Sequence, residues 1–440
     1  MNLGLYFHTI KHLKPVQFFG RASRFLIPAV SHVAPAPSRR GTVERWRVVV
    51  ERTPRIVGRD RCRFLNQEHD VGSASVWNDK QRDLLWLYNL HYFDDLNASD
   101  AVSRLPIHRR LMSRWVVENP AGLGVGWQPY PLSLRIVNWI KWALSGYELD
   151  VPSFQSLAVQ VRFLRPRLEY HLLGNHLFEN AKALIFAGAF FDSPEAKRWL
   201  AKGRTLLARE LTEQVLSDGG HFERSPMYHA LVLEGILDLI QLQRIFPSVF
   251  QSESYTALIE TAERMLNWLR VMTHPDGEIA LFNDTAFGIA GSLADLERYA
   301  SMLDLRVPSS YAKTVVDCQA SGYVRLTMGD AVLIVDVGEI GPDYLPGHAH
   351  ADTLSFELSV GGRRVIVNSG TSCYGIGRER LRQRSTSAHN TVEVDEQSSS
   401  EVWGSFRVAR RARPFGLQVF DNGDHIVVRC SHDGYARLPG

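Results

Sequence analysis

Three short stretches of the sequence contain side chains that can exchange protons or bind charge. They are residues 174–180 (GNHLFEN), 218–229 (DGGHFERSPMYH) and 347–356 (GHAHADTLSF). Each combines His with amide, phenol or carboxylate groups, which are the usual general acids and bases of enzymes. Taken one at a time, each stretch also has an ordinary structural explanation.

In the first stretch, Asn175, His176, Glu179 and Asn180 share one arc of about 140° if the segment is a helix. The opposite face continues into an apolar run, which we expect to be buried. Buried polar groups need partners or a wet cleft. The arc is therefore either a hydrogen-bond network at a helix start or part of a substrate cleft.

In the second stretch, Ser225 precedes Pro226, which is typical of an N-cap followed by the first helical residue. Tyr228 then falls in the first turn, where the helix dipole favours a phenolate. Positive charge on the neighbouring Arg224 and His229 should also favour the phenolate form of Tyr228. We therefore expect a tyrosine whose pKa is lowered from its usual value of about 10. An ordinary core tyrosine is the alternative.

In the third stretch, His348, His350 and Asp352 alternate, so they share one face if the segment is a strand. Two histidines and a carboxylate can hold a metal ion or form an acid/base cluster. His389 follows within residues 384–390 (RSTSAHN).

The predicted secondary structure that must position these groups changes along the chain, from helices to strands. Apolar residues recur with helical spacing in seven segments, 104–119, 133–149, 153–172, 175–191, 193–216, 225–246 and 255–274. Successive helices with short links predict antiparallel pairs, in a solenoid or a closed toroid. From about residue 321 the period becomes two, over 322–338, 353–370, 389–397, 411–420 and 424–430, which predicts an antiparallel sandwich. We expect a mixed lead-in (1–75), a helical domain (76–310) and a sheet domain (311–440) that is incomplete or unusually small, with the boundary at Val307–Ser310.

Composition excludes several classes of protein. Hydrophobic residues make up 45% and the formal net charge is +3, so nothing indicates a nucleic-acid partner. The longest apolar run, Ala183 to Phe191, is far shorter than the roughly 20 residues of a transmembrane helix. Basic residues interrupt every apolar stretch among the first 30 residues, so we expect no secretory signal but an amphipathic helix, packed on its own domain or on a membrane surface. The compartment and the oligomeric state stay open.

Together, the segments 86–96 (WLYNLHYFDDL), 126–142 (GWQPYPLSLRIVNWIKW), 174–184, 218–229, 347–358, 365–371 (VIVNSGT) and 384–395 resemble the heparinase II/III-like family of polysaccharide lyases. The resemblance implies an incomplete (α/α) toroid followed by an antiparallel β-sandwich. It also implies β-elimination at a uronic acid of an acidic polysaccharide. By similarity, Asn175 neutralises the substrate carboxylate with help from His176. Tyr228 is the base, or also the acid, and His348 is the base or acid according to the stereochemistry of the uronate.

The resemblance also implies contacts with substrate and metal. By similarity, Glu179 forms a substrate-cleft pair with His176. The other predicted substrate-binding residues are Trp127, Tyr130, Arg135, Arg224 and His229, which the resemblance does not assign. Aromatic side chains such as the two named here suit sugar stacking, although aromatics are more often core residues. A structural zinc ion would be held by His350, Asn368 and His389, and Asn368 stands where the family has Asp.

Two other functions stay open. A glycoside hydrolase on a related (α/α) scaffold needs two carboxylates about 5–9.5 Å apart, and the helical region offers Glu179, Glu223, Asp276 and Asp284. A non-catalytic polysaccharide-binding protein of exopolysaccharide assembly is the other alternative. The sequence does not distinguish heparan sulfate from an alginate-like polymer or a bacterial exopolysaccharide.

Overall fold

The computed structural model describes residues 3–26, 32–50, 52–250, 252–307 and 313–439, and the chain divides into two compact units. The helical unit comprises residues 16–211 and 237–256, and the sheet unit comprises residues 1–15, 212–236 and 257–440. The chain therefore passes from one unit to the other within helices α9 (Pro226–Ile245) and α10 (Ser252–Val271). Three consecutive segments were expected instead. Of the predicted boundary at Val307–Ser310, residues 308–310 lie outside the described residues.

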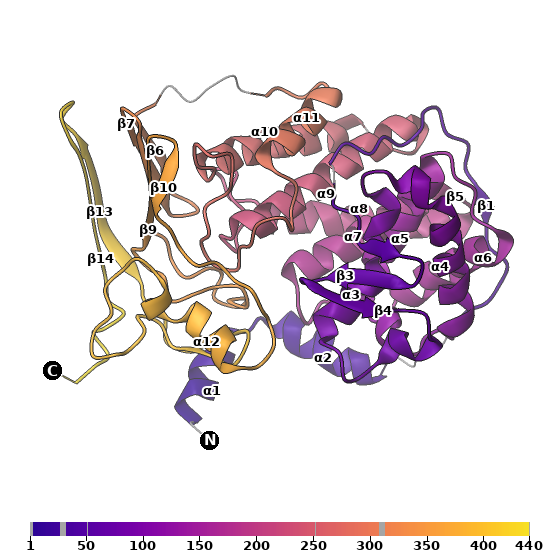
Figure 1. The fold of residues 1–440 in the computed structure, drawn as a ribbon, viewed down its shortest axis with the longest axis horizontal. Coiled ribbons are helices and arrows are strands. Elements are labelled where there is room, and N and C mark those ends of the chain that lie inside the picture. The colour runs from indigo at the N-terminus through magenta and orange to yellow at the C-terminus, as the bar shows by residue number, and fades with distance from the viewer. Residues whose placement is uncertain (1–2, 27–31, 51, 251, 308–312, 440) are drawn as a thin grey trace. The chain divides into compact units, whose positions relative to one another are not determined.

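Packed helices form most of the helical unit (Figure 1). They are α2 (Pro15–Leu26), α3 (Leu84–Tyr92), α4 (Leu105–Glu118), α5 (Pro129–Leu144), α6 (Val151–Leu164), α7 (Gly174–Phe190) and α8 (Pro194–Gln214). Helix α5 packs against α3, α6 and α7, and nearly every residue of α7 is buried. The seven predicted helices are confirmed. Helix α6 ends before the predicted residue 172, because Pro166 lacks the N–H that would continue the hydrogen-bond ladder.

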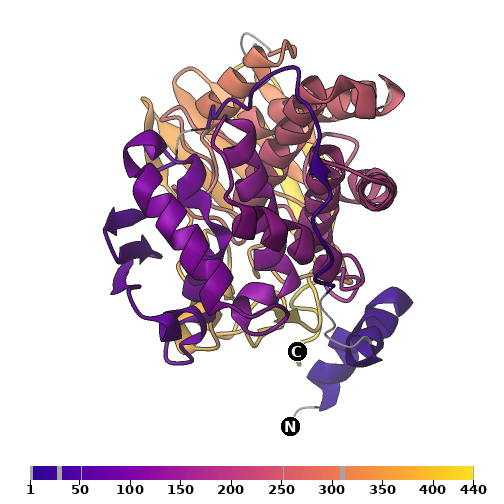
Figure 2. The same ribbon diagram turned by 90° about the vertical axis from the view of Figure 1, so that its right-hand side faces the viewer.

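A small antiparallel sheet lies at the edge of the helical unit (Figure 2, left). Its strands are β2 (Ile56–Gly58), β3 (Arg61–Phe64) and β4 (Gln67–Asp70). Phe64 packs on Trp86 of α3, with ring centroids 5.2 Å apart. Strands β1 (Ser38–Arg39) and β5 (Phe191–Asp192) form a second short pair. The part of the lead-in from residue 16 onward therefore belongs to the helical unit, whereas α1 (Leu3–Ile10) belongs to the sheet unit.

The sheet unit is built on a five-stranded antiparallel sheet in the order β10-β9-β8-β7-β6. Its elements are α1 (Leu3–Ile10), α11 (Leu293–Met302), β6 (Val315–Cys318), β7 (Tyr323–Met328), β8 (Ala331–Asp336), β9 (Phe356–Val360), β10 (Arg363–Ile366), α12 (Arg378–Arg384), β11 (Val402–Trp403), β12 (Arg407–Val408), β13 (Pro414–Asp421) and β14 (Ile426–His432). The turn between β9 and β10 is formed by Gly361 and Gly362, both with positive φ, as a two-residue hairpin turn requires.

The two faces of this sheet are covered by different elements. Val332 and Ile334 of β8 pack with Trp268 and Met272 near the end of α10. Leu333 and other alternate residues pack against the β13–β14 hairpin, so the predicted sandwich is confirmed, with a hairpin as its second layer (Figure 1).

The strand predicted over residues 389–397 is wrong. Asp395 and Glu396 adopt positive φ angles, and the bridge between Val394 and Gln397 closes this segment as a tight turn.

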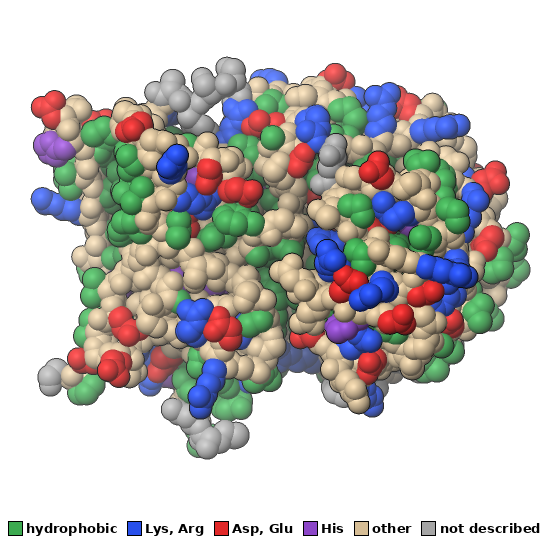
Figure 3. All heavy atoms as spheres, in the orientation of Figure 1, with side chains coloured by type: hydrophobic (Ala, Val, Ile, Leu, Met, Phe, Trp, Pro, Cys, Tyr) green, Lys and Arg blue, Asp and Glu red, His purple; other side chains and the backbone are tan. Residues whose placement is uncertain are grey.

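Among the described residues, no helix is long and apolar enough to span a membrane. On the face shown in Figure 3, acidic and basic side chains are interspersed. This mixed surface agrees with the small net charge of the chain.

Candidate active site

His348 and Tyr228 meet in the sheet unit. Their rings stack with centroids 3.9 Å apart and planes 11° apart. Nδ1 of His348 lies 2.5 Å from Oε2 of Glu223, so the carboxylate fixes the imidazole proton on Nδ1 and leaves Nε2 as a proton acceptor. The side chain of Glu223 is only 5% exposed and that of His348 is 18% exposed. The arrangement is that of an oriented histidine beside a phenol.

The start of α9 places Tyr228 as predicted. The backbone N–H of Tyr228 donates to Oγ of Ser225 at 3.2 Å, which confirms Ser225 as the N-cap and Pro226 as the first helical residue. Oγ of Ser225 donates in turn to the carbonyl oxygen of Asp284 at 2.7 Å. The first turn of the helix is thereby tied to the loop that carries Asp284.

The predicted direction of the Tyr228 pKa is wrong. Burial raises this pKa well above 10, and the neighbouring Tyr374, Asp284 and Glu223 raise it further. Arg224 does not oppose this effect, because its guanidinium donates to the carbonyl oxygen of Glu339. Tyr228 is therefore a protonated phenol at neutral pH, which suits a proton donor.

His229, which was also expected to favour the phenolate, faces away from Tyr228. Its Nε2 bonds to the carbonyl oxygen of Met265 at 2.9 Å, and its ring lies against Trp268. Burial lowers the pKa of His229 to about 3, so it carries no positive charge at neutral pH. His229 has no exposed surface, which leaves no atom for a substrate.

Tyr374, Arg380 and Asp284 support this pair, and the sequence did not single out the first two. The hydroxyl of Tyr228 donates to that of Tyr374 at 3.2 Å. The guanidinium of Arg380 binds both carboxylate oxygens of Asp284, one at 2.7 Å, and lies 5.1 Å from the Tyr374 ring centroid. Neither Tyr374 nor Arg380 lies in a periodic pattern with the predicted residues, so no sequence signal marked them.

The segment from His348 to Asp352 is a loop rather than a strand, so its polar side chains do not share one face. His350 Nε2 contacts Oδ1 of Asp284 at 2.8 Å, whereas Oδ2 of Asp352 accepts from the backbone N–H of Asn283 at 3.3 Å. The side chains of His348, His350 and Asp352 therefore have different partners, and the three do not form one set of metal ligands.

The predicted zinc ligands do lie together. The rings of His350 and His389 are 5.2 Å apart, and Nδ1 of His389 lies 3.2 Å from Oδ1 of Asn368. The 3.2 Å between these two donor atoms is close to the distance between two ligands of a tetrahedral zinc ion, each of which lies roughly 2.0–2.2 Å from the metal. Among the residues that the structure describes, Nδ1 of His350 has no hydrogen-bond partner, while Asp284 holds its Nε2, as outer carboxylates do for zinc-bound histidines. The geometry fits an ion.

The charge of these ligands does not favour zinc. The described residues contain no group of three His, Cys, Asp or Glu side chains able to hold a metal ion, because the third donor, Asn368, is a neutral amide. A bound zinc ion therefore stays a prediction.

A second polar cluster lies in the helical unit, at the start of α7. Nδ2 of Asn175 donates to the hydroxyl of Tyr130 at 3.1 Å. The Tyr130 ring lies against His176, with centroids 4.4 Å apart, and Nδ1 of His176 is 3.3 Å from Oε1 of Glu169. Oδ1 of Asn175 has no hydrogen-bond partner within the described part of the chain. The predicted residues Asn175, His176 and Tyr130 are thus brought together.

The rest of the predicted arc points elsewhere. Glu179 is 6% exposed and pairs with Lys182 at 3.0 Å. Asn180 is fully buried and donates to Ser133 and Glu169. These two side chains belong to the internal network at the helix start, which was the structural alternative.

Arg135 and Trp127 are core residues of the helical unit. Arg135 has no exposed surface. Its guanidinium donates to the carbonyl oxygens of His91 and Gly126 and lies 3.7 Å from the Trp115 ring centroid. It therefore holds the loop before α5 and leaves no atom for a substrate. Trp127 is 4% exposed, but it borders a cavity.

Because Asn175 belongs to the helical unit and the Tyr228–His348 pair to the sheet unit, their meeting around one sugar ring stays a prediction.

Comparison with known proteins identifies the relatives. Residues 153–305 match the family described as heparinase II/III N-terminus, and residues 312–440 match the heparinase II/III-like C-terminal family. The heparin-sulfate lyases of Bacteroides stercoris and Pedobacter heparinus are each 26% identical to this chain, over 53% and 65% of it and over 37% and 47% of their own lengths. FtsZ-localized protein C of Caulobacter vibrioides is 24% identical over 79% of this chain and 56% of its own length. The chain thus spans about half the length of these relatives.

Solved structures share the fold. A crystal structure of heparinase III aligns over 81% of this chain and 63% of its own, with a TM-score of 0.58 and 18% identity. A heparan sulfate lyase from Pedobacter heparinus aligns over 96% of this chain and 70% of its own, with a TM-score of 0.54 and 19% identity. The two family matches cover well over half of the chain, in the expected order. The chain belongs to the heparinase II/III-like family.

Proposed function

We propose that this protein is a polysaccharide lyase that cleaves an acidic, uronic-acid-containing polysaccharide by β-elimination. The observation that carries the proposal is the stacked Tyr228–His348 pair with Glu223 on Nδ1 of the histidine. It supplies one proton acceptor and one proton donor side by side, which is what elimination requires.

In the proposed reaction, Nε2 of His348 removes the C5 proton of the uronate. The electron pair of that bond forms the C4–C5 double bond, and the C4–O bond breaks. The protonated phenol of Tyr228 then gives its proton to the leaving oxygen, and no water is added. Asn175, with His176 nearby, would donate to the uronate carboxylate and so stabilise the charge that develops on it.

The carboxylates available for hydrolysis argue against the glycoside hydrolase alternative. Glu223 is held by His348, Asp284 by Arg380, Asp276 by Arg364 and Glu179 by Lys182. Each candidate acid or nucleophile already has a cationic or imidazole partner. Burial opposes ionisation of Asp276 and Asp284, but hydrogen bonds from their partners lower the pKa of both carboxyl groups. Burial raises the pKa of Glu179, whose carboxylate is committed to Lys182.

The test is a panel of uronic-acid polysaccharides, with the ultraviolet absorbance of unsaturated uronate as the readout. We expect absorbing products from at least one polymer. Tyr228→Phe and His348→Ala should each lower turnover by at least about 10²-fold with little change in binding. Cleavage without absorbing products would replace the lyase by a hydrolase. Binding without cleavage, unaffected by Tyr228→Phe, would replace it by a non-catalytic polysaccharide-binding protein.

A further inference from the structure

Helix α2 lies along the lower edge of the helical unit (Figure 1) and packs closely on the loop before α7. Gly20 of α2 is buried, and a Cβ atom at this position would lie 2.7 Å from the backbone nitrogen of His171. One turn earlier, Gln17 is 3% exposed. One turn later, Nη1 of Arg24 lies 2.7 Å from Nε2 of His171. The two backbones therefore meet at a distance that only glycine allows.

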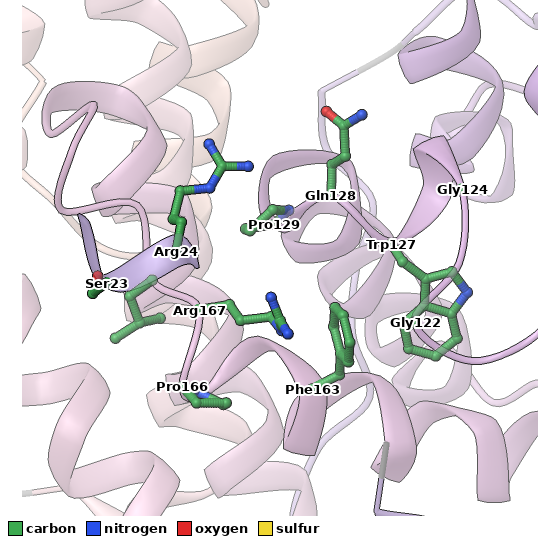
Figure 4. A pocket seen from close by; sticks show the side chains of 11 residues that line it. Ser23, Arg24, Gly122, Gly124, Trp127, Gln128, Pro129, Phe163, Pro166 and Arg167 are labelled. Carbon is green, nitrogen blue, oxygen red and sulfur yellow. The ribbon is translucent and has the colours of Figure 1, made fainter. Parts of the chain in front are cut away.

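The same side of α2 borders a cavity of about 190 Å³ (Figure 4). Ser23 and Arg24 line it from α2, and Pro166 and Arg167 line it from the loop after α6. Together with the close contact at Gly20, this arrangement fixes which side of α2 faces the helical unit. The helix cannot roll about its axis without placing a side chain where Gly20 now lies.

The opposite side of α2 is apolar and exposed. At 100° per residue, four side chains fall within one arc of about 100° on the side away from Gly20, namely Phe18, Phe19, Ala22 and Leu26. The exposed fractions of the three larger ones are 47%, 74% and 80% in that order. A surface helix ordinarily turns its apolar stripe toward the core, so α2 is inverted. Single exposed apolar side chains are common, but a continuous stripe of them marks an interaction surface.

The chain around α2 is basic. Six Lys and Arg residues precede the first acidic residue, Glu44, although the whole chain has a formal net charge of only +3. Helix α2 contains Arg21 and Arg24 and no acidic residue. Arg21 is exposed and lies about 60° around the helix from Phe18, at one edge of the apolar arc. The exposed side of α2 therefore combines apolar side chains with positive charge.

We propose that α2 binds the surface of a lipid bilayer with anionic headgroups. The helix axis lies parallel to the bilayer, Phe18 and Phe19 enter the boundary between headgroups and acyl chains, and Arg21 lies at the level of the phosphates. A bilayer offers apolar chains directly beneath anionic groups, which is the combination that this exposed side matches. The sequence predicts an amphipathic helix packed either on its own domain or on a membrane surface, and α2 has a separate face for each. The proposal is independent of the proposed lyase activity.

The test is co-sedimentation of the full chain with vesicles of phosphatidylcholine alone and of phosphatidylcholine mixed with phosphatidylglycerol. Phe19→Ser and Arg21→Gln are compared with control variants of exposed residues elsewhere in the helical unit. Val117→Ser on α4 is the apolar control, because Val117 is 80% exposed, and Arg198→Gln on α8 is the charge control. All four positions are exposed, so the variants should melt like the wild-type chain.

We expect the wild-type chain to bind the mixed vesicles more tightly than the neutral ones, and to be released as the salt concentration rises. Phe19→Ser should weaken binding to the mixed vesicles by at least about tenfold, because it removes most of one inserted side chain. Arg21→Gln should weaken it by about fivefold and leave binding to neutral vesicles unchanged. Each control variant should change binding by less than about twofold.

Three results would overturn the proposal. The first is failure of the wild-type chain to bind the mixed vesicles, and the second is equal binding by Phe19→Ser and Val117→Ser. The third is a wild-type chain that is dimeric without lipid, a monomeric Phe19→Ser, and no vesicle binding by either, which would show that a second copy covers this side of α2. Equal binding to both kinds of vesicle would overturn the role of anionic headgroups. No polysaccharide is present, so this test and the lyase test fail separately.

Discussion

Glu223 offers a direct perturbation of the proposed proton transfer. Glu223→Gln keeps the shape of the side chain but removes the charge that faces Nδ1 of His348 across 2.5 Å. Both groups are largely shielded from water, so solvent screens this contact little. A hydrogen bond to a charged group contributes about 1.5–3 kcal/mol. If His348 takes up the C5 proton, the carboxylate stabilises the imidazolium formed in the transition state, and its loss should lower kcat by roughly tenfold to a hundredfold.

The assay is steady-state kinetics on the polymer that the panel identifies. KM should change little, because Glu223 acts through His348 and is only 5% exposed. Glu401→Gln, which removes a partly exposed ion pair with Arg410, is the matched control and should retain normal kcat. A double-mutant cycle with His348→Ala should be strongly non-additive, because the carboxylate has no role once the imidazole is absent. Normal kcat in Glu223→Gln, or additive effects in the cycle, would refute the assigned role of Glu223.

Two further predictions concern stability and metal binding. Burial opposes ionisation of Asp95, but hydrogen bonds from His108, Ile56 and Arg104 outweigh it and lower its pKa to about 2. Relative to an ordinary Asp near 3.9, this shift contributes about 2.5 kcal/mol of stability above pH 4, which is lost as the pH falls through 2. In denaturant unfolding, Asp95→Asn should have a free energy of unfolding lower than that of the wild-type chain by this amount at pH 7, and by a smaller amount near pH 3. A difference that does not change with pH would contradict the lowered pKa of Asp95. Asn368→Asp should bind zinc more tightly than the wild-type chain and melt at a lower temperature until zinc is added, because it places an anionic ligand beside His389. Metal analysis and melting curves with and without zinc measure this, and equal zinc content in both proteins would count against the site.

The helices and their order could be predicted because their apolar spacing is long and regular. The cap at Ser225 is a local signal, so the sequence also placed Tyr228 correctly in the first turn of α9. The direction of the Tyr228 pKa could not be predicted in the same way. It depends on burial and on Tyr374 and Asp284, which are distant in the chain, whereas the neighbouring Arg224 turns toward Glu339.

Burial also separates two of the predicted substrate-binding residues from solvent. Arg135 and His229 have side-chain types that bind sugars, but tertiary packing makes both of them core residues. Conversely, Arg24 and Arg167 lie 143 positions apart in the sequence, and only the fold brings them to one cavity. Asn175, Tyr130 and His176 were found because two short motifs marked them, although nothing in their spacing showed that they would be in contact.

The proposed β-elimination cleaves the polymer without the addition of water, whereas hydrolysis adds one water for each bond that is cut. Mass spectrometry of the products from a uronic-acid oligosaccharide of defined length measures this directly, with ultraviolet absorbance recorded on the same sample. We expect fragment pairs whose masses add up to that of the substrate, with one fragment of each pair carrying the unsaturated uronate. Fragment pairs heavier than the substrate by one water, with no absorbance, would contradict it.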